Sequence, residues 1–124
     1  MLKQETAERQ NIRLWVKSKM EISKKDWAVF REKIGQWQEA YMGKLCEEYK
    51  AILESDTLAS EKFRELDQRL KDDKRHPGVI LQMRKSDMIH NLISLVNDGV
   101  ITIEDLSGFS EDTVEFVRKF TLDI

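Results

Sequence analysis

Hydrophobic side chains recur every three or four residues along a long middle stretch of the chain. From Trp27 to Tyr41 the apolar positions are spaced 3, 4, 3 and 4 residues apart, and a second set continues from Met42 to Leu53. Because an α-helix turns about 100° per residue, these positions fall on one stripe. The preceding S-K-K-D, residues 23–26, resembles a capping box. The pattern predicts an amphipathic helix over residues 24–54.

The predicted helix is unusually long for a chain of 124 residues. At 1.5 Å per residue it would extend for roughly 46 Å, which exceeds the width of a domain of this size. Three outcomes are consistent with that length. The helix protrudes from the domain, it kinks near Gly35 or Gly43, or it packs against a partner chain.

Shorter helical patterns flank this spine. They predict helices over 4–20, over 58–74 with Asp56 or Thr57 as the N-cap, in a segment ending near 97, as a single turn over 103–106, and over 111–121 with Ser110 as the N-cap. The start of the fourth helix stays open between Pro77 and Ser86. We therefore expect an all-α fold of four to five helices in a single domain, 1–124. The long amphipathic helix is its spine, residues 1–22 form a peripheral N-terminal helix, and a short helix-turn-helix ends the chain.

The segment S-L-V-N-D-G-V-I-T-I-E-D-L, residues 94–106, resembles the exit half of a calcium-binding loop. If Gly99 fills the sixth loop position, Asp105 fills the twelfth. The entry half then has Ser94 and Val96 where calcium needs oxygen ligands, so we expect no calcium binding. The alternative is helix capping, in which Gly99 ends one helix and Thr102 with Asp105 begins the next.

Charge is distributed unevenly along the chain, although the formal net charge is only -2. Residues 1–34 contain nine Lys or Arg against five Asp or Glu, a net of +4, and residues 62–85 contain eight against four, again +4. Residues 97–124 contain two against seven, a net of -5. The acidic end disfavours DNA recognition by its helix pair, since a recognition helix must approach phosphates. The two basic stretches leave a helical nucleic-acid-associated regulator as the alternative function.

One basic cluster is a candidate binding patch. It comprises Lys71, Lys74, Arg75, His76 and Arg84, around the turn K-D-D-K-R-H-P-G. Such side chains could hold a phosphate or an acidic partner. The negative charges of Asp72 and Asp73 reduce the positive potential of this cluster by about half. Cations at a helix C-terminus are also favoured by the helix dipole without any ligand. The simpler interpretation is a solvated helix end.

Residues suited to catalysis are few and scattered. Cys46 lies at the edge of the long apolar stripe, which predicts a semi-buried structural thiol. His76 lies in a turn. His90 falls on the side of its helix opposite the apolar residues, so we expect it to be exposed. Asp87 and His90 form a carboxylate–histidine pair at helical spacing, but one pair is a weak signal, because helical metal sites draw ligands from several helices. We expect no enzymatic activity, no cofactor and no metal.

The location expected from the sequence is the cytoplasm. The N-terminus lacks the apolar region of a signal peptide, and no apolar run approaches the roughly 20 residues that span a bilayer. A single cysteine fits a reducing compartment. We therefore expect no membrane contact.

The aromatic residues of the spine are the main candidates for an interface. Trp27, Phe30, Trp37 and Tyr41 share one helical face. Burial in the core explains them, and so does contact with a partner, because Trp and Tyr are enriched at binding hot spots. A second copy of the chain is one candidate partner, and the acidic C-terminal segment is a second candidate contact surface.

The segments W-Q-E-A-Y-M (37–42), D-K-R-H-P-G-V (73–79) and R-K-S-D-M-I (84–89), with the D-G-V-I-T-I-E-D-L and G-F-S segments, resemble a group of small soluble bacterial proteins of unknown function. Some of that group are labelled "multidrug transporter". The resemblance covers about residues 25–120 and implies no activity, cofactor or catalytic residue. Taken with the residue patterns, the sequence predicts a protein that acts through protein–protein contact, as an adaptor, an inhibitor or a regulatory subunit.

Overall fold

The computed structural model describes residues 22–121, and these form helices and turns without a strand. The elements are α2 (Lys24–Leu53), α3 (Ala59–Asp73), the 3-10 turn η1 (Lys85–Asp87), α4 (Met88–Asn97), the 3-10 turn η2 (Ile103–Leu106) and α5 (Glu111–Phe120). The predicted all-α fold is confirmed. The helix expected over 4–20 lies outside the described residues.

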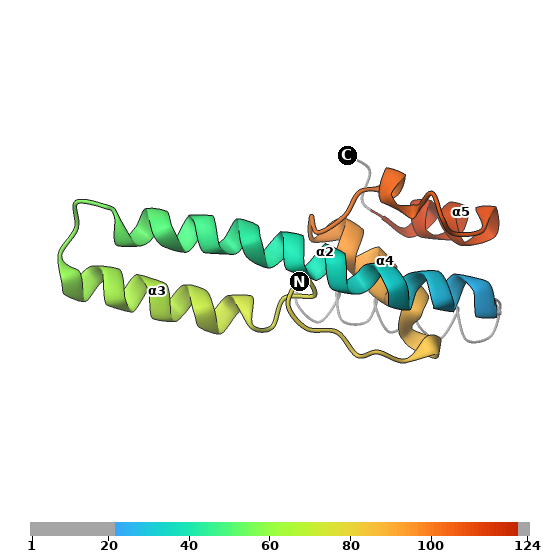
Figure 1. Ribbon diagram of the computed structural model, residues 1–124, viewed down its shortest axis with the longest axis horizontal. Helices are drawn as coiled ribbons and strands as arrows, with labels where there is room; N and C mark the ends of the chain where they lie inside the picture. Colours follow the sequence, from blue (N-terminus) through green and yellow to red (C-terminus); the bar gives the residue numbers. More distant parts are fainter. Residues whose placement is uncertain (1–21, 122–124) are drawn as a thin grey trace.

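The long helix α2 runs along most of the length of the molecule (Figure 1). Ser23 begins it, and its side chain accepts a hydrogen bond from the Asp26 backbone, as the capping pattern predicted. The helix continues through Gly35 and Gly43 for 30 residues. Its first half packs in a helical body with α4, η2 and α5. Its second half leaves the body and pairs with α3 as a two-helix arm. The helix therefore protrudes from the body, and packing of the protruding half against a partner chain stays a prediction.

The helix α3 is the outer partner in this arm and contains no buried residue. Leu58 is its N-cap and makes no side-chain cap bond, so the prediction of Asp56 or Thr57 as the cap was wrong. The Thr57 hydroxyl lies 2.9 Å from the Ser55 hydroxyl, which also donates to the Ile52 carbonyl. Thr57 is thus engaged in closing the end of α2 rather than in starting α3.

The core of the body surrounds α4, in which seven of ten residues are buried. Phe30 and Ile34 from α2 pack in the same cluster, as do Phe116 and Val117 from α5. The helix begins at Met88, directly after η1, with Asp87 as its N-cap, so its start lies near Ser86 and not at Pro77, although Ser86 itself does not cap it. An extended connection precedes η1, and the Asn91 side chain donates to the Gln82 carbonyl in that connection at 2.9 Å.

The turns after α4 are those that the helix-capping pattern predicted. Gly99 has φ of 77°, the left-handed conformation that glycine adopts at helix ends. Thr102 and Asp105 form a capping box at η2, and Asp105 accepts from the Thr102 backbone at 2.8 Å. Ser110 caps α5 through the Thr113 backbone. The Asp105 carboxylate thus has a role in the turn itself.

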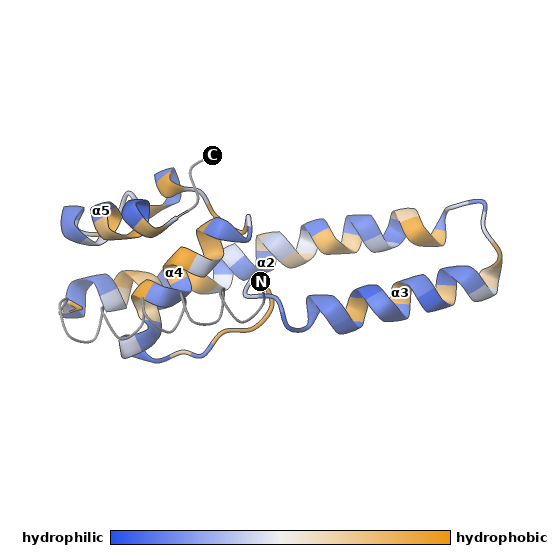
Figure 2. Cartoon of the chain, turned by 180° about the vertical axis from the view of Figure 1, so that it is seen from behind, coloured by the Kyte–Doolittle hydropathy of each residue, from blue (hydrophilic) through white to orange (hydrophobic). Residues whose placement is uncertain are grey.

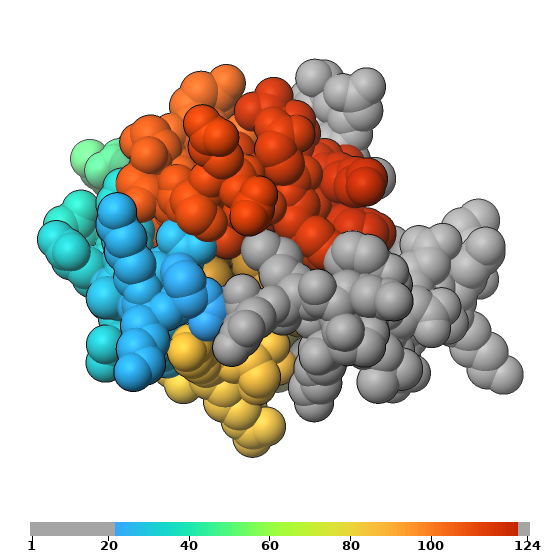
Figure 3. Space-filling view, turned by 90° about the vertical axis from the view of Figure 1, so that its right-hand side faces the viewer, coloured from blue at the N-terminus to red at the C-terminus, as the bar shows by residue number. Residues whose placement is uncertain are grey.

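The first turn of α2 is joined to the first turn of α5 by a buried carboxylate. Asp26 is 2% exposed and accepts from the Ser110 backbone at 2.9 Å, the Ser110 hydroxyl at 2.7 Å and the Thr113 hydroxyl at 2.6 Å. Seen from this end of the molecule, the start of α2 lies directly against the segment leading into α5 (Figure 3). Asp26 therefore holds in place the Ser110 cap of a helix other than its own.

Candidate functional site

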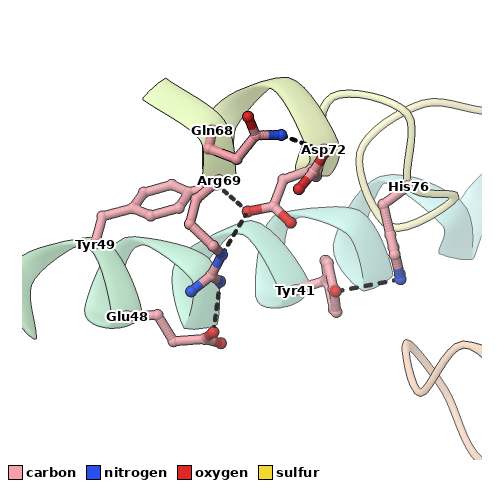
Figure 4. A network of polar contacts seen from close by, with 8 residues as sticks. Tyr41, Glu48, Tyr49, Gln68, Arg69, Asp72 and His76 are labelled. Carbon is pink, nitrogen blue, oxygen red and sulfur yellow. Dashed lines mark hydrogen bonds and ion pairs between the residues drawn. The ribbon is translucent and has the colours of Figure 1, made fainter. Parts of the chain in front are cut away.

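Polar contacts join the two helices of the arm, and these begin at its base. The ring of His76 stacks on Tyr41 with centroids 4.5 Å apart and planes 6° from parallel. The Gly78 N–H donates to His76 Nδ1 at 3.0 Å, and the Gln38 amide donates to the Pro77 carbonyl at 3.0 Å. These contacts hold the His-Pro-Gly turn on the surface of α2, and Figure 4 shows its His76 beside Tyr41.

Further along the arm, charged groups connect the two helices. Arg69 donates to Glu48 at 2.6 Å and lies 3.7 Å from Asp73, while the Tyr49 hydroxyl donates to Asp73 at 2.6 Å (Figure 4). The Arg69 guanidinium also lies 5.7 Å from the centre of the Tyr49 ring. Leu45 and Ile52 are buried beneath these contacts. These contacts fix the register of α3 on α2, and the charged groups that make them are paired with one another.

The environment of Tyr49 raises the pKa of its phenol to about 12. Burial is the main cause, and the hydrogen bond to Asp73 together with the negative charge of that carboxylate adds to it. The pKa of Tyr41 is raised as well, by burial first and then by the charges of Asp73 and Glu48. Both phenols therefore remain neutral hydrogen-bonding groups at any physiological pH.

A spectrophotometric titration of the tyrosinate absorbance should reveal this environment. We expect both tyrosines to ionise above the ordinary pKa of 10, and Tyr49 to ionise near 12. Because the folded-state pKa is raised, the stability that Tyr49 contributes is present below pH 10 and is lost as the pH rises through about 12. The variant Asp73→Asn should lower the Tyr49 pKa. An unchanged titration in that variant would contradict the assigned contact.

The arm also has apolar side chains that are open to solvent, next to the Tyr49–Asp73 contact. Phe63 is 77% exposed, Leu53 52% and Leu70 38%, and Leu58 at the tip is 69% exposed. Cys46 is exposed on the same arm and Met42 is half-buried. Figure 2 shows hydrophobic bands along both helices of the arm. We call Met42, Cys46, Leu53, Phe63 and Leu70 the open hairpin face.

The structure separates the four aromatic residues that the sequence offered as an interface. Phe30 is fully buried, so its assignment to an interface was wrong; it packs between Trp27 and Trp37, with ring centroids at 5.8 Å and 6.4 Å. Trp27 and Trp37 are half-buried against the same core. Tyr41 is half-buried and is covered by the His76 ring. The stripe thus belongs mainly to the body and to the base of the arm.

The residues of the candidate basic patch have different environments. Lys71 pairs with Asp67 at 2.9 Å, and His76 turns inward onto Tyr41. Lys74 and Arg84 are exposed, and Arg75 lines a shallow pocket that also includes Pro77, Ile80 and Leu81. The sequence interpretation of His76 as part of a solvated helix end was therefore incorrect.

Two further predictions about polar residues were also wrong. Cys46 is exposed rather than semi-buried, because it lies one residue, about 100°, beyond the buried Leu45. His90 is only partly exposed, and its Nδ1 atom is buried. Among the described residues, no three His, Cys, Asp or Glu side chains are grouped as metal ligands.

Sequence reasoning missed the open hairpin face, although its signal was present. The expected helix over 58–74 had an apolar stripe containing Phe63 and Leu70, and nothing in the sequence identified what would cover that stripe. It also missed the hydrogen bonds between Asp26 and the start of α5, because no pattern in the neighbouring residues indicates them.

Comparisons with protein-family models, with curated proteins and with solved structures each found no match to this chain. Within residues 22–121, no helix combines the length and the apolar character required to span a bilayer.

Proposed function

We propose that the protein works by binding another protein chain, as an adaptor, an inhibitor or a regulatory subunit, and that the open hairpin face makes the contact. The observation that carries this proposal is the exposure of Phe63 and Leu53, at 77% and 52%, on one ordered arm. Exposed apolar residues are common singly, whereas a contiguous group on a rigid element is typical of an interaction surface.

The polar contacts of the same arm support this assignment. Some of the charges on the arm are paired with each other, as in Arg69 with Glu48 and Lys71 with Asp67. Pairing of this kind weakens the positive field that binding to a phosphate backbone requires. An apolar contact needs no such field, because burial of hydrocarbon supplies the free energy. The exposed thiol of Cys46 fits the cytoplasm as the proposed setting, since thiols stay reduced there.

Site-specific photo-cross-linking in living cells tests the proposal. A benzoyl-phenylalanine residue at position 63 should give a discrete cross-linked product, because the native Phe63 side chain is exposed on the contact face. The same probe at position 65, where Glu65 is exposed on the charged side of α3, is the matched control. Mass spectrometry would identify the captured chain. Equal products from both positions, or none from either, would refute a contact through this face.

A further inference from the structure

The apolar residues of α3 do not point directly at α2. Four half-buried residues mark the side of α3 that faces α2: Lys62, Leu66, Arg69 and Asp73. The apolar stripe, which includes Phe63 and Leu70, is centred about 60° from that direction at 100° per residue. This displacement explains why Leu66 is half-buried while Phe63 is 77% exposed.

The same displacement occurs on α2. The buried residues Leu45 and Ile52 mark the side that faces α3. Cys46 and Leu53 each follow one of them by a single residue, about 100° around the helix in the direction of increasing residue number. On α3 the stripe is displaced in the same rotational sense. Because the two helices are right-handed and antiparallel, equal rotational senses carry both stripes to the same side of the arm.

We infer that the open hairpin face pairs with the same face of a second copy of this chain, forming an antiparallel four-helix bundle. Two antiparallel helices can cover only the seam between them, and a second hairpin placed on the open side encloses a shared core. Phe63 and Leu53 near the tip of one arm would then lie against Leu70 and Met42 near the base of the other. This inference rests on the proposed function and names the partner.

The size of the face suits a dimer. An arm two helices wide, about 20 Å, and about 14 residues long, about 21 Å, offers roughly 400 Å² in projection. Pairing two such faces buries on the order of 1,000 Å² or more of accessible surface, close to the lower end of the range for specific complexes. A second copy also matches the face in length and apolar pattern, because both surfaces are identical.

The shape of the molecule selects the antiparallel arrangement. The body occupies one end of α2 and the arm extends from the other (Figure 1). Arms that run in opposite directions place the two bodies at opposite ends of the bundle, whereas arms that run in the same direction place them at one end, where they compete for space. Charge at the edge of the face presents no barrier, since Asp67 already pairs with Lys71 there.

Light scattering on the purified full chain, from micromolar to a few hundred micromolar, tests the inference. We expect twice the monomer mass of 14.7 kDa at the high end. Phe63→Lys, which places a charge in the shared core, should weaken dimerisation at least tenfold. Glu65→Lys introduces the same side chain on the opposite side of α3 and should leave the dimer intact. Circular dichroism should give equal helicity for both variants, since neither native side chain is buried.

Nitroxide labels at Asp56→Cys in a Cys46→Ser chain measure the direction of the arms. Residue 56 lies in the loop at the tip, so antiparallel arms separate the two labels by more than about 25 Å, from the rise per residue. Labels closer than about 15 Å would overturn the antiparallel arrangement. A monomer at all concentrations, or a dimer indifferent to Phe63→Lys, would overturn self-pairing itself. If that monomer still gives a position-63 cross-link to another protein, the proposed function stands without it.

Discussion

Replacement of Asp26 by alanine should cost about 3 kcal/mol of folding stability. The carboxylate is 2% exposed and accepts three hydrogen bonds from Ser110 and Thr113. Its removal takes the acceptor from the buried Thr113 hydroxyl and from the partly buried donors of Ser110, and each such loss to a charged group costs roughly 1.5–3 kcal/mol before relaxation. Urea denaturation at neutral pH measures the difference. Asp112→Ala, at an exposed carboxylate in the first turn of α5, is the control and should change stability by less than about 0.5 kcal/mol.

The pH dependence identifies the carboxylate as the source of this effect. Burial acts to raise the pKa of Asp26, but hydrogen bonds from Thr113, Ser110 and Ser23 outweigh it, so the pKa lies below its ordinary value of 3.8. A lowered folded-state pKa contributes stability above the unfolded pKa and loses it as the pH falls through the folded value. The gap between the wild type and Asp26→Ala should therefore be constant above about pH 5 and shrink below about pH 4. A gap that stays constant down to pH 2 would contradict the ionised network.

The substitution Gly78→Ala should cost about 2–4 kcal/mol, because there is no room for a side chain. A Cβ atom at this position would collide with Cδ2 of Tyr41. The Tyr41 ring is held in place because it stacks on His76. Either the ring or the His-Pro-Gly turn must move, and movement of the turn breaks the Gly78 N–H bond to His76. Thermal unfolding monitored by circular dichroism measures the loss.

Gly43→Ala is the matched control for this experiment. A Cβ atom there meets nothing within 4 Å, and the residue lies inside α2. Alanine favours a helix over glycine by roughly 0.5–1 kcal/mol, so this variant should be stabilised. In a Tyr41→Ala chain, the cost of Gly78→Ala should fall to less than half. An undiminished cost would show that the close approach to Tyr41 is not its cause.

Local signals in the sequence predicted much of this fold. Ser23, Gly99 and Ser110 each end or begin a helix through bonds to residues within four positions, and such short-range bonds are visible as spacing. The apolar period similarly located α2 to within one residue at its C-terminal end. These elements are readable because their physical causes lie in adjacent residues.

Contacts between distant residues were not predictable in the same way. Asp26 appeared to be half of a local capping box, yet its carboxylate binds Ser110, which is 84 positions away. His76 appeared to be part of a charged helix end, and stacking on Tyr41, 35 positions earlier, turns it inward. The apolar stripe of α3 was visible, but which of its residues α2 would cover depended on how the two helices rotate against each other. The spacing of apolar residues predicts which face of a helix is apolar, but the packing of the helices decides which residues that face contacts.

The separation between Asp26 and Ser110 also has a consequence for the order of folding. The contacts that close the arm join residues 21 to 39 positions apart, as in Arg69 with Glu48 and Gln38 with Pro77. Loop-closure entropy increases with the length of chain enclosed, so the arm can close at a smaller entropic cost than the body. During synthesis, the chain needs to emerge only as far as Gly78 for the arm to form. Phe109 and Phe116, which belong to the same core cluster as Phe30, emerge later. We therefore expect the body to be completed on an arm already in place.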